Sequence, residues 1–461
     1  MKKVIYMFLA AATVFAGCEN GASNKKSEYA PETDAQLVST AKDAYIYGFP
    51  LILSEISQKY AGAVSGEYAA NRIINMPAFA DDSFKMSVKP APFVFTSFAW
   101  LDLSSEPFVF EMPEIKGRYA FLSVSDAWRN DIFSTAAFGA PARKIAVAGP
   151  AWSGIAPDGA ELYRSRTNTV FLSLQIEVKN TQDAAAAKKI QSLLKLYPLS
   201  FYGRQYKAQA LKREDSSYQK HPLEQVFAMG ADEYFNLLNK LTVSNLPSEF
   251  DSAALDGFLD IGLAPGMRFD MSLFSEDLKA AFDKIASQAK ERLQNDVFAS
   301  LKEGWLFFEN LGNFKSDYSS RAKAAFSGFS RFNGAFCAEA YADAEGEKLD
   351  GSKNGYVLHF DKDAVPSEES FWSVAVYGAD GFFVKNKINR FAFGSASGSA
   401  PAPKLNKDGS MDIYVRFSDP GKDKNWLPCP RGVFTVVFRY ALIFDSGAGR
   451  MLLPAVNKEV K

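Results

Sequence analysis

The chain has 461 residues, of which 47% are hydrophobic and 40 are phenylalanine, and its formal net charge is −1. This apolar content is enough for two or three packed domains. No basic stripe runs through the sequence, so we expect no nucleic-acid partner.

The N-terminus is typical of a secretory signal peptide. Lys2 and Lys3 precede an apolar stretch at residues 4–15, which is followed by the small pair Ala16-Gly17. About a dozen apolar residues are too few to span a bilayer, which takes roughly 20. We therefore assign residues 1–17 to a signal peptide, and we exclude residues 1–32 from the fold.

Cys18 directly follows the two small residues, and this arrangement resembles the bacterial lipoprotein box. The resemblance implies cleavage before Cys18 and attachment of fatty acids such as palmitate. The polar residues 18–32 would then form a flexible tether. We expect a protein anchored in the bacterial cell envelope, at the outer membrane, on its periplasmic face or at the surface. An ordinary signal with an incidental cysteine is the alternative.

The first element of the folded part is a predicted helix at residues 34–60, where Leu37, Ala41 and Tyr45 keep helical spacing. Pro50 lies inside this stretch. Proline lacks a backbone N–H and clashes with the preceding turn. The sequence therefore predicts a kink or a break near Pro50.

Residues 93–178 change to a period of two. In 118–126, Tyr119, Phe121 and two serines fall on one face, while Ala120, Leu122 and Val124 fall on the other. Short strands separated by turns favour an antiparallel sandwich. We assign residues 33–180 to a helix followed by this first β-sandwich.

Helical periodicity returns in the middle of the chain, which we assign to residues 181–340. Four segments carry it: 181–199, 230–241, 275–301 and 319–341. From Tyr356 the period is again two, and residues 341–461 are predicted to form a second sandwich. The expected fold class is α+β, mainly β with a helical middle region and two antiparallel β-sandwich domains.

Several stretches resemble the paired bacterial domain-of-unknown-function families 1254 and 1214, in that order along the chain. The stretches are "AKDAYIYGFPLIL", "AWLDLSSEPFVFEMPEIKGRYAFLSVSDAW", "IGLAPGMRFD", "LDGSKNGYVLHF", "FWSVAVYGADGFFVKNKINRFAFGS", "DGSMDIYVR" and "NWLPCPRGVFTVVFRY". The resemblance implies two β-sandwiches around a helical segment in an exported protein. It brings no established reaction.

The chain departs from the family pattern at two places. A polar Asp-Thr-x-Tyr in the family corresponds here to residues 93–96, Phe-Val-Phe-Thr, and a family arginine corresponds to Gln175. These changes imply that a polar site of the relatives is largely replaced by hydrocarbon. We therefore expect the Trp-Leu-Asp-Leu stretch at 100–103 to end a strand, with Asp102 as a turn carboxylate.

Seven side chains are candidates for ligand binding, because aromatic rings and guanidinium groups often contact flat ligands such as sugars. Core packing explains each of them as well, and Arg118 has Asp126 as a possible ion-pair partner across the sandwich rim. The four C-terminal candidates would together line one polar-aromatic cleft. The candidates are Trp100, Arg118, Trp128, Trp372, Tyr377, Arg390 and Trp426.

The sequence offers few groups for catalysis. Its two histidines are His221, which we expect to be exposed, and His359, which we expect to be half-buried with a hydrogen-bonded ring. There is no Gly-x-Ser-x-Gly turn and no glycine-rich phosphate loop. We assign no catalytic residue, no metal site and no cofactor. Cys337 and Cys429 are predicted to be free buried thiols, with a disulfide between them as the alternative.

Two classes of function follow. The first is an envelope lipoprotein that binds a glycan, a lipid or a protein. The second is a carboxylate-dependent hydrolase that uses Asp102 and Asp126 as glycosidases use their carboxylate pair. Two carboxyl groups at glycosidase separation inside one cleft would favour the enzyme. The scarcity of titratable groups favours the binding protein.

Overall fold

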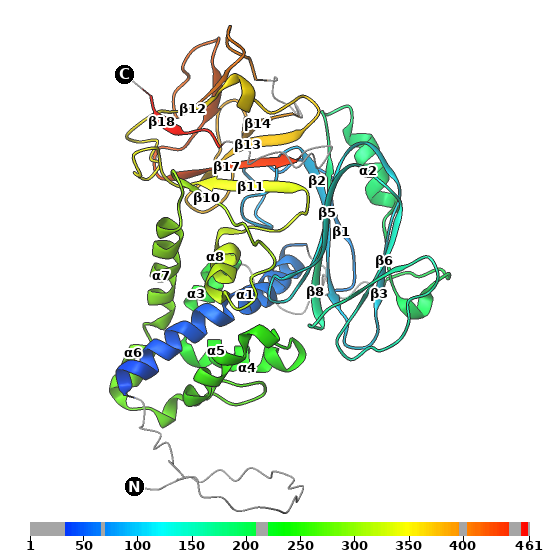
Figure 1. Cartoon of the computed structure of the whole chain (residues 1–461), viewed down its shortest axis with the longest axis vertical. Helices are drawn as coiled ribbons and strands as arrows, with labels where there is room; N and C mark the ends of the chain where they lie inside the picture. The colour runs from blue at the N-terminus through cyan, green and yellow to red at the C-terminus, as the bar shows by residue number, and fades with distance from the viewer. Residues whose placement is uncertain (1–32, 66–69, 209–219, 396–402, 442–452, 460–461) are drawn as a thin grey trace, which may run out of the picture.

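The computed structural model describes residues 33–65, 70–208, 220–395, 403–441 and 453–459. Cys18 and the remainder of the segment 1–32 lie outside these residues. Figure 1 shows three packed parts: the first sandwich on the right, the second at the top and the helical region at the lower left. The α+β class and the two mostly antiparallel β-sandwiches are confirmed.

The first sandwich packs a five-stranded sheet against a four-stranded sheet. Phe95, Ala99 and Leu101 point into the core between the sheets, whereas Phe98 and Trp100 point outward and are also buried. In order across the sheets, the strands are β1 Ile74–Met76, β2 Val94–Asp102, β8 Thr169–Glu177, β4 Ile115–Asp126 and β5 Asp131–Ala140, then β7 Glu161–Arg164, β6 Arg143–Ala148, β3 Phe108–Met112 and β9 Lys195–Pro198.

The second sandwich repeats this plan with its own core around Leu358, Val374 and Phe438. Pairing is antiparallel except between β15 and β16, and between β6 and β7 in the first sandwich. The strands are β10 Trp305–Leu306, β11 Ala335–Ala340, β17 Phe434–Ala441, β13 Phe371–Gly378 and β14 Ala392–Gly394, then β16 Asn425–Pro428, β15 Met411–Arg416, β12 Tyr356–Phe360 and β18 Val456–Lys458.

The helical region surrounds α1, Asp34–Ser65, which is drawn in blue in Figure 1. Tyr45 of α1 stacks on Tyr234 with ring centroids 3.9 Å apart, and its hydroxyl donates to the Val226 carbonyl at 3.0 Å. The other helices are α2 Ala184–Leu193, α3 Pro222–Ala228, α4 Ala231–Ser244, α5 Ser252–Phe258, α6 Glu276–Phe282, α7 Ile285–Ala299 and α8 Tyr318–Ser327, with 3-10 turns η1 Leu199–Phe201, η2 Glu249–Asp251, η3 Leu259–Ile261, η4 Met271–Leu273 and η5 Lys362–Ala364.

The structure excludes a break at Pro50, one of the two expected outcomes, and changes the end of α1. The helix continues through Pro50 without a break, and it ends at Ser65 rather than at residue 60. Gly48 lies against α4, where a Cβ would approach a Leu238 methyl carbon to 2.8 Å. A larger side chain at position 48 would therefore collide with α4. No helix among the described residues is long and apolar enough to cross a membrane.

Two segments predicted as helix are partly strand. The helix in 181–199 ends at Leu193, and β9 then joins the first sandwich. The helix in 319–341 ends at Ser327, and residues 335–340 form β11 in the second sandwich. Gly328, with φ of 75°, caps α8 in the left-handed conformation that glycine adopts without strain.

The outer faces of the two five-stranded sheets pack against each other. Phe121 of β4 meets Phe371 of β13 with ring centroids 4.9 Å apart. The Tyr119 hydroxyl donates to the Glu369 carbonyl at 3.1 Å, and the Tyr377 hydroxyl donates to the Pro90 carbonyl at 2.7 Å. The sandwiches therefore form one unit, and the space beside this contact is the site described next.

Candidate functional site

A cavity of about 1420 Å³ lies where the three parts of the molecule meet. Its floor is the outer face of β2, β8, β4 and β5. Its walls come from α1, α8 and the segments beside them, and from β11 and β17 of the second sandwich. Small-molecule sites usually measure about 300–1,000 Å³, so this cavity has room for a large ligand.

The floor is built by the strand register. Thr96 lies opposite Gln175, and Gln175 lies opposite Phe121. The next row places Phe98 beside Ser173 and Ser173 beside Ser123. Because side chains alternate along each strand, all six residues project from the same face. The four polar side chains form a strip across the three strands, and Phe98 and Phe121 lie at its two sides.

Aromatic rings dominate the cavity lining. Phenylalanine is the most frequent residue among the described residues that line it. Trp100 packs on Phe171 with ring centroids 4.5 Å apart, and Phe308 packs on Phe329 at 5.2 Å. The indole N–H of Trp100 is buried and has no hydrogen-bond partner. The surface offered to a ligand is therefore largely apolar.

One end of the cavity carries two carboxyl groups. The Asp126 carboxylate accepts hydrogen bonds from the backbone N–H of Asn130 at 2.8 Å and from its side-chain amide at 2.9 Å. Burial raises the pKa of Asp126 to about 6. Asp131 accepts from Ser134 at 2.9 Å, and Arg331 lies 3.5 Å away. Burial also raises the pKa of Asp131.

A buried polar group lies beside the second sandwich. Lys89 donates to Glu339 at 2.6 Å, to the Ser327 carbonyl at 2.9 Å and to the Tyr341 hydroxyl at 3.1 Å. The carboxylate and the ammonium neutralise each other, and the lysine uses all three of its donors. This cation is therefore already satisfied by the protein.

Among the predicted binding residues of the first sandwich, Trp100 alone lines the cavity. Arg118 pairs with Asp183 at 2.7 Å, not with Asp126. Trp128 lies in the helical core, where its indole N–H donates to the Asn245 carbonyl at 3.1 Å. Asp102 is exposed and accepts from the Ser104 backbone at 3.0 Å, so it is a turn carboxylate as expected.

The predicted cleft of Trp372, Tyr377, Arg390 and Trp426 is not formed. Trp372 and Tyr377 are five positions apart on β13 and thus point to opposite faces of the sheet. Trp372 enters the core of the second sandwich, whereas Tyr377 enters the contact between the sandwiches. Arg390 does meet Trp426, because it donates to the Trp426 carbonyl at 2.8 Å.

The cavity floor was missed by sequence reasoning, although one signal pointed to it. Thr96 and Gln175 both stand where the chain departs from the family pattern, and the structure pairs them across β2 and β8. Two departures from one pattern that face each other across a sheet indicate a shared surface. The signal identified the surface but not its enclosure by the helices and the second sandwich.

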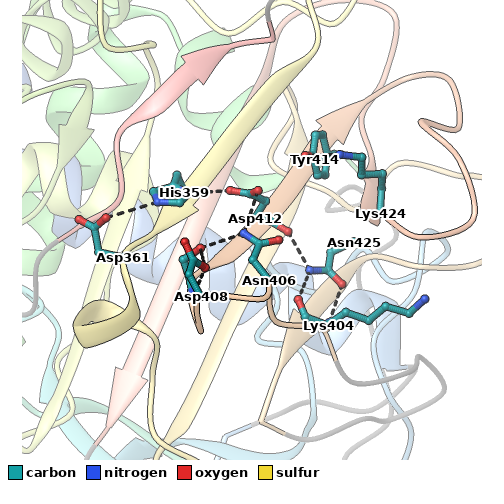
Figure 2. A network of polar contacts seen from close by, with 10 residues as sticks. His359, Asp361, Lys404, Asn406, Asp408, Asp412, Tyr414, Lys424 and Asn425 are labelled. Atoms are coloured by element: carbon teal, nitrogen blue, oxygen red, sulfur yellow. Dashed lines mark hydrogen bonds and ion pairs between the residues drawn. The ribbon is translucent and has the colours of Figure 1, made fainter.

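A separate polar network covers the outer face of β12 and β15 (Figure 2). His359 Nδ1 lies 2.6 Å from Asp412, and its Nε2 lies 3.3 Å from Asp361. Asn406 donates to Asp412 at 3.0 Å. His359 is exposed rather than half-buried, because it lies on the solvent side of β12. Within the described residues no cluster of histidine, cysteine and carboxylate side chains is arranged to hold a metal ion.

His221 also differs from expectation. It is half-buried at the start of α3, with its ring near Tyr60 at 6.0 Å and Phe382 at 5.2 Å, and it lines the cavity. Cys337 and Cys429 are both free, as predicted, but Cys337 is half-buried and only Cys429 is fully buried. Burial raises the pKa of both thiols, that of Cys429 to about 12, so neither is a reactive thiolate at neutral pH.

Two family models match the chain. The model described as a protein of unknown function, DUF1254, matches residues 70–198, and the corresponding model DUF1214 matches residues 334–441. The chain carries the DUF1254 and DUF1214 domains, in that order. The DUF1254 domain holds every strand of the first sandwich and so supplies the cavity floor. The DUF1214 domain supplies β11 and β17, while α1 and α8 lie outside both matches.

The chain resembles solved structures over most of its length. The VPA0106 protein of Vibrio parahaemolyticus matches with a TM-score of 0.61 and 24% identity, over 92% of this chain and 100% of that one. An uncharacterised protein of Burkholderia cenocepacia matches with a TM-score of 0.44 and 12% identity, over 92% and 96% of the two chains. The first match shows the fold common to both proteins. No curated protein matches the sequence.

Proposed function

We propose that this protein is a lipid-anchored envelope protein that binds a lipid-like ligand in the cavity between its DUF1254 and DUF1214 domains. The observation that carries the proposal is the cavity itself, with its volume of about 1420 Å³ and its lining rich in phenylalanine. Burial of apolar ligand surface against such a lining contributes roughly 25 cal/mol per Å².

Lipid is favoured over the two other ligand classes considered above. Sugar binding needs many free hydrogen-bonding groups. Among the described residues, Lys89 already uses all three of its donors, while one oxygen each of Asp131 and Glu339 and the indole N–H of Trp100 lack a partner. These groups are set in a lining in which phenylalanine is the most frequent residue. A folded protein partner needs an accessible surface, whereas the floor residues Ser123 and Ser173 are each 6% exposed. An elongated apolar molecule needs neither many hydrogen-bonding groups nor an accessible outer surface.

The anchor and the cavity would act together. Acylation of Cys18 would hold the folded part within reach of the membrane through the tether 18–32. The envelope membranes would then be the source or the destination of the ligand.

A glycosidase-like hydrolase remains the alternative because Asp126 lines the cavity and has a pKa raised to about 6, which suits a general acid. The two-carboxylate mechanism needs a second carboxyl group across the scissile bond. Asp102 does not supply it, because it lies in an exposed turn outside the cavity lining. Asp131 lines the same end of the cavity as Asp126, but it accepts from Ser134 at 2.9 Å and lies 3.5 Å from Arg331. This arrangement favours binding over hydrolysis.

The proposal is tested by identifying what the protein carries. We expect organic extraction of the full-length Cys18→Ala variant, which removes the anchor lipid itself, to release a lipid in near-equal molar amount, detected by mass spectrometry. Gln175 lines the cavity, so Gln175→Trp should reduce the bound lipid severalfold. Gln182→Trp, at an exposed position before α2, is the matched control and should retain it.

Two results would contradict lipid binding. One is an extract that holds no more lipid than an unrelated exported protein purified in the same way. The other is equal lipid content in Gln175→Trp and Gln182→Trp.

A further inference from the structure

Arg129 differs from the other cations that line the cavity. Lys89 pairs with Glu339 at 2.6 Å, Arg331 with Asp131 at 3.5 Å, and Lys302 with Glu309 at 3.4 Å. Within the part of the chain that the structure describes, Arg439 has no carboxylate at ion-pair distance. It donates to the Tyr377 hydroxyl at 3.1 Å and to the Lys89 carbonyl at 2.7 Å.

The guanidinium of Arg129 has much weaker contacts with the protein. Its hydrogen bond to the Phe329 carbonyl is 3.5 Å long, which is beyond the usual range of about 2.7–3.2 Å. Among the described residues, no carboxylate lies within ion-pair distance of it. The nearby Asp126 carboxylate bonds to Asn130 instead. Arg129 therefore presents an uncompensated positive charge to the cavity.

The backbone holds this side chain in place. Arg129 occupies the tight turn between β4 and β5 with φ of 68°, a left-handed conformation uncommon for a large side chain. Its N–H donates to the Asp126 carbonyl at 3.0 Å, and the Asp126 N–H donates to the Asn130 carbonyl at 2.9 Å. Strained backbone of this kind often occurs at binding sites.

The charge persists at neutral pH. Burial lowers the pKa of Arg129 to about 10, which leaves the guanidinium protonated. Arg129 is half-buried. A charge that is partly removed from water and has no partner is unfavourable, and an anion that enters the site reduces that penalty. Arginine binds carboxylates and phosphates especially well, because its planar N–H groups match the spacing of two oxygens.

An apolar surface begins next to this turn. Ser125 lies opposite Phe171, and Phe171 lies opposite Trp100, so Phe171 is one strand and Trp100 two strands away from the end of β4. On the other side, Phe329 packs on Phe308. A charged head at Arg129 would thus be continuous with a path for a hydrocarbon chain.

We infer that Arg129 binds the anionic head group, a carboxylate or a phosphate, of an amphipathic ligand whose hydrocarbon chain lies along Phe171 and Trp100. This inference rests on the proposed lipid binding and specifies the chemistry of the ligand. The competing explanation is that Arg129 only fastens the turn to the Phe329 carbonyl.

The test compares ligands that share a chain and differ in the head. Dodecanoic acid, dodecyl phosphate and dodecanol are titrated at pH 7.5, below their aggregation concentrations, into the full-length Cys18→Ala protein and its variants. We expect the protein to bind at least one of the two anions about 10- to 100-fold more tightly than the alcohol, as for a hydrogen bond to a charged group. The stronger of the two anions identifies the head group.

Arg129→Met should abolish this preference while it leaves dodecanol affinity within about threefold, and Arg129→Lys should retain part of it. Arg164→Met removes the same side chain and charge from an exposed position outside the cavity and should keep the full preference. Thermal melting of each variant identifies any that fails to fold, in which case Arg129→Lys carries the comparison.

The outcomes separate the two proposals. If neither anion is preferred over dodecanol, lipid binding survives and the role of Arg129 is overturned. If Arg129→Met lowers the affinity for the acid and for the alcohol by the same factor, the arginine is structural and the inference again fails. If the protein binds none of the three ligands, the proposed function and this inference fall together.

Discussion

Arg321 of α8 and Asp251 of η2 form an ion pair with an N–O distance of 3.0 Å, and both side chains are 0% exposed. The Tyr47 hydroxyl donates to the same carboxylate oxygen at 3.2 Å. The guanidinium lies 5.3 Å from the Trp128 ring centroid and 5.4 Å from that of Tyr47. The pair thus joins α8, η2 and α1 at the centre of the helical core.

Loss of one partner should destabilise the protein strongly, because the other charge stays buried without compensation. We expect Arg321→Met to lower the free energy of unfolding by about 3–5 kcal/mol, whereas the double variant Arg321→Met with Asp251→Leu should recover much of that loss. Urea unfolding monitored by tryptophan fluorescence measures both. A double variant that is less stable than Arg321→Met would contradict this expectation.

Phe95 and Asp102, both on β2, should respond in opposite ways to substitution. Phe95 is 2% exposed between the sheets of the first sandwich, so Phe95→Ala should lower the free energy of unfolding by about 3–5 kcal/mol. Asp102→Asn retains the exposed turn and should lower the free energy of unfolding by no more than about 1 kcal/mol. Thermal unfolding checks both values. A stable Asp102→Asn protein that has lost ligand binding would instead make Asp102 a functional residue.

The two histidines should titrate on opposite sides of the usual value of 6.5. The hydrogen bond to the Asp412 carboxylate raises the pKa of His359, whereas burial lowers the pKa of His221. The stability that His359 contributes is therefore present below pH 6.5 and is lost as the pH rises through its folded-state pKa. For His221 the sign reverses, and stability is lost as the pH falls below 6.5.

Imidazole NMR titration measures both values, and His221→Gln assigns the signals. Asp412→Asn should lower the pKa of His359 and leave that of His221 unchanged. Coincident titration of the two rings would contradict the environments described here.

The lipid anchor makes a prediction independent of the fold. Cys18→Ala should move the protein from the membrane fraction to the soluble fraction and abolish incorporation of labelled palmitate. Cys429→Ala, which removes a buried free thiol, is the control and should remain at the membrane. Membrane association of Cys18→Ala equal to that of the unmodified sequence would refute the anchor.

The sequence predicts the sandwiches well because alternation is a local signal. Ala120, Leu122 and Val124 face the sandwich core, and Tyr119 and Phe121 face outward, as the period of two indicated. The prediction of one helix over residues 319–341 was wrong in its second half, because the alanines and phenylalanines there suit a buried strand as well as a helix. The β11 part is decided by pairing with β17, about 100 residues later, which no local pattern reports.

The candidate site was harder to predict. The same alternation separates Trp372 from Tyr377 on β13, so the failure of that cleft followed from information already in the sequence. The cavity depends on Thr96, Arg129, Ala325 and Arg439 meeting in space. Their meeting results from packing among three distant regions, and the sequence pattern alone does not specify such packing.

The position of α1 at the start of the folded chain governs the order in which the molecule can be completed. Tyr45 and Phe49 are synthesised early, yet their partners Val226, Tyr234 and Phe326 follow about 180–280 residues later. At about 5–20 residues per second, the apolar surface of α1 waits roughly ten seconds to a minute for its core. A truncated chain that ends after the first sandwich would therefore keep an exposed apolar helix and should aggregate.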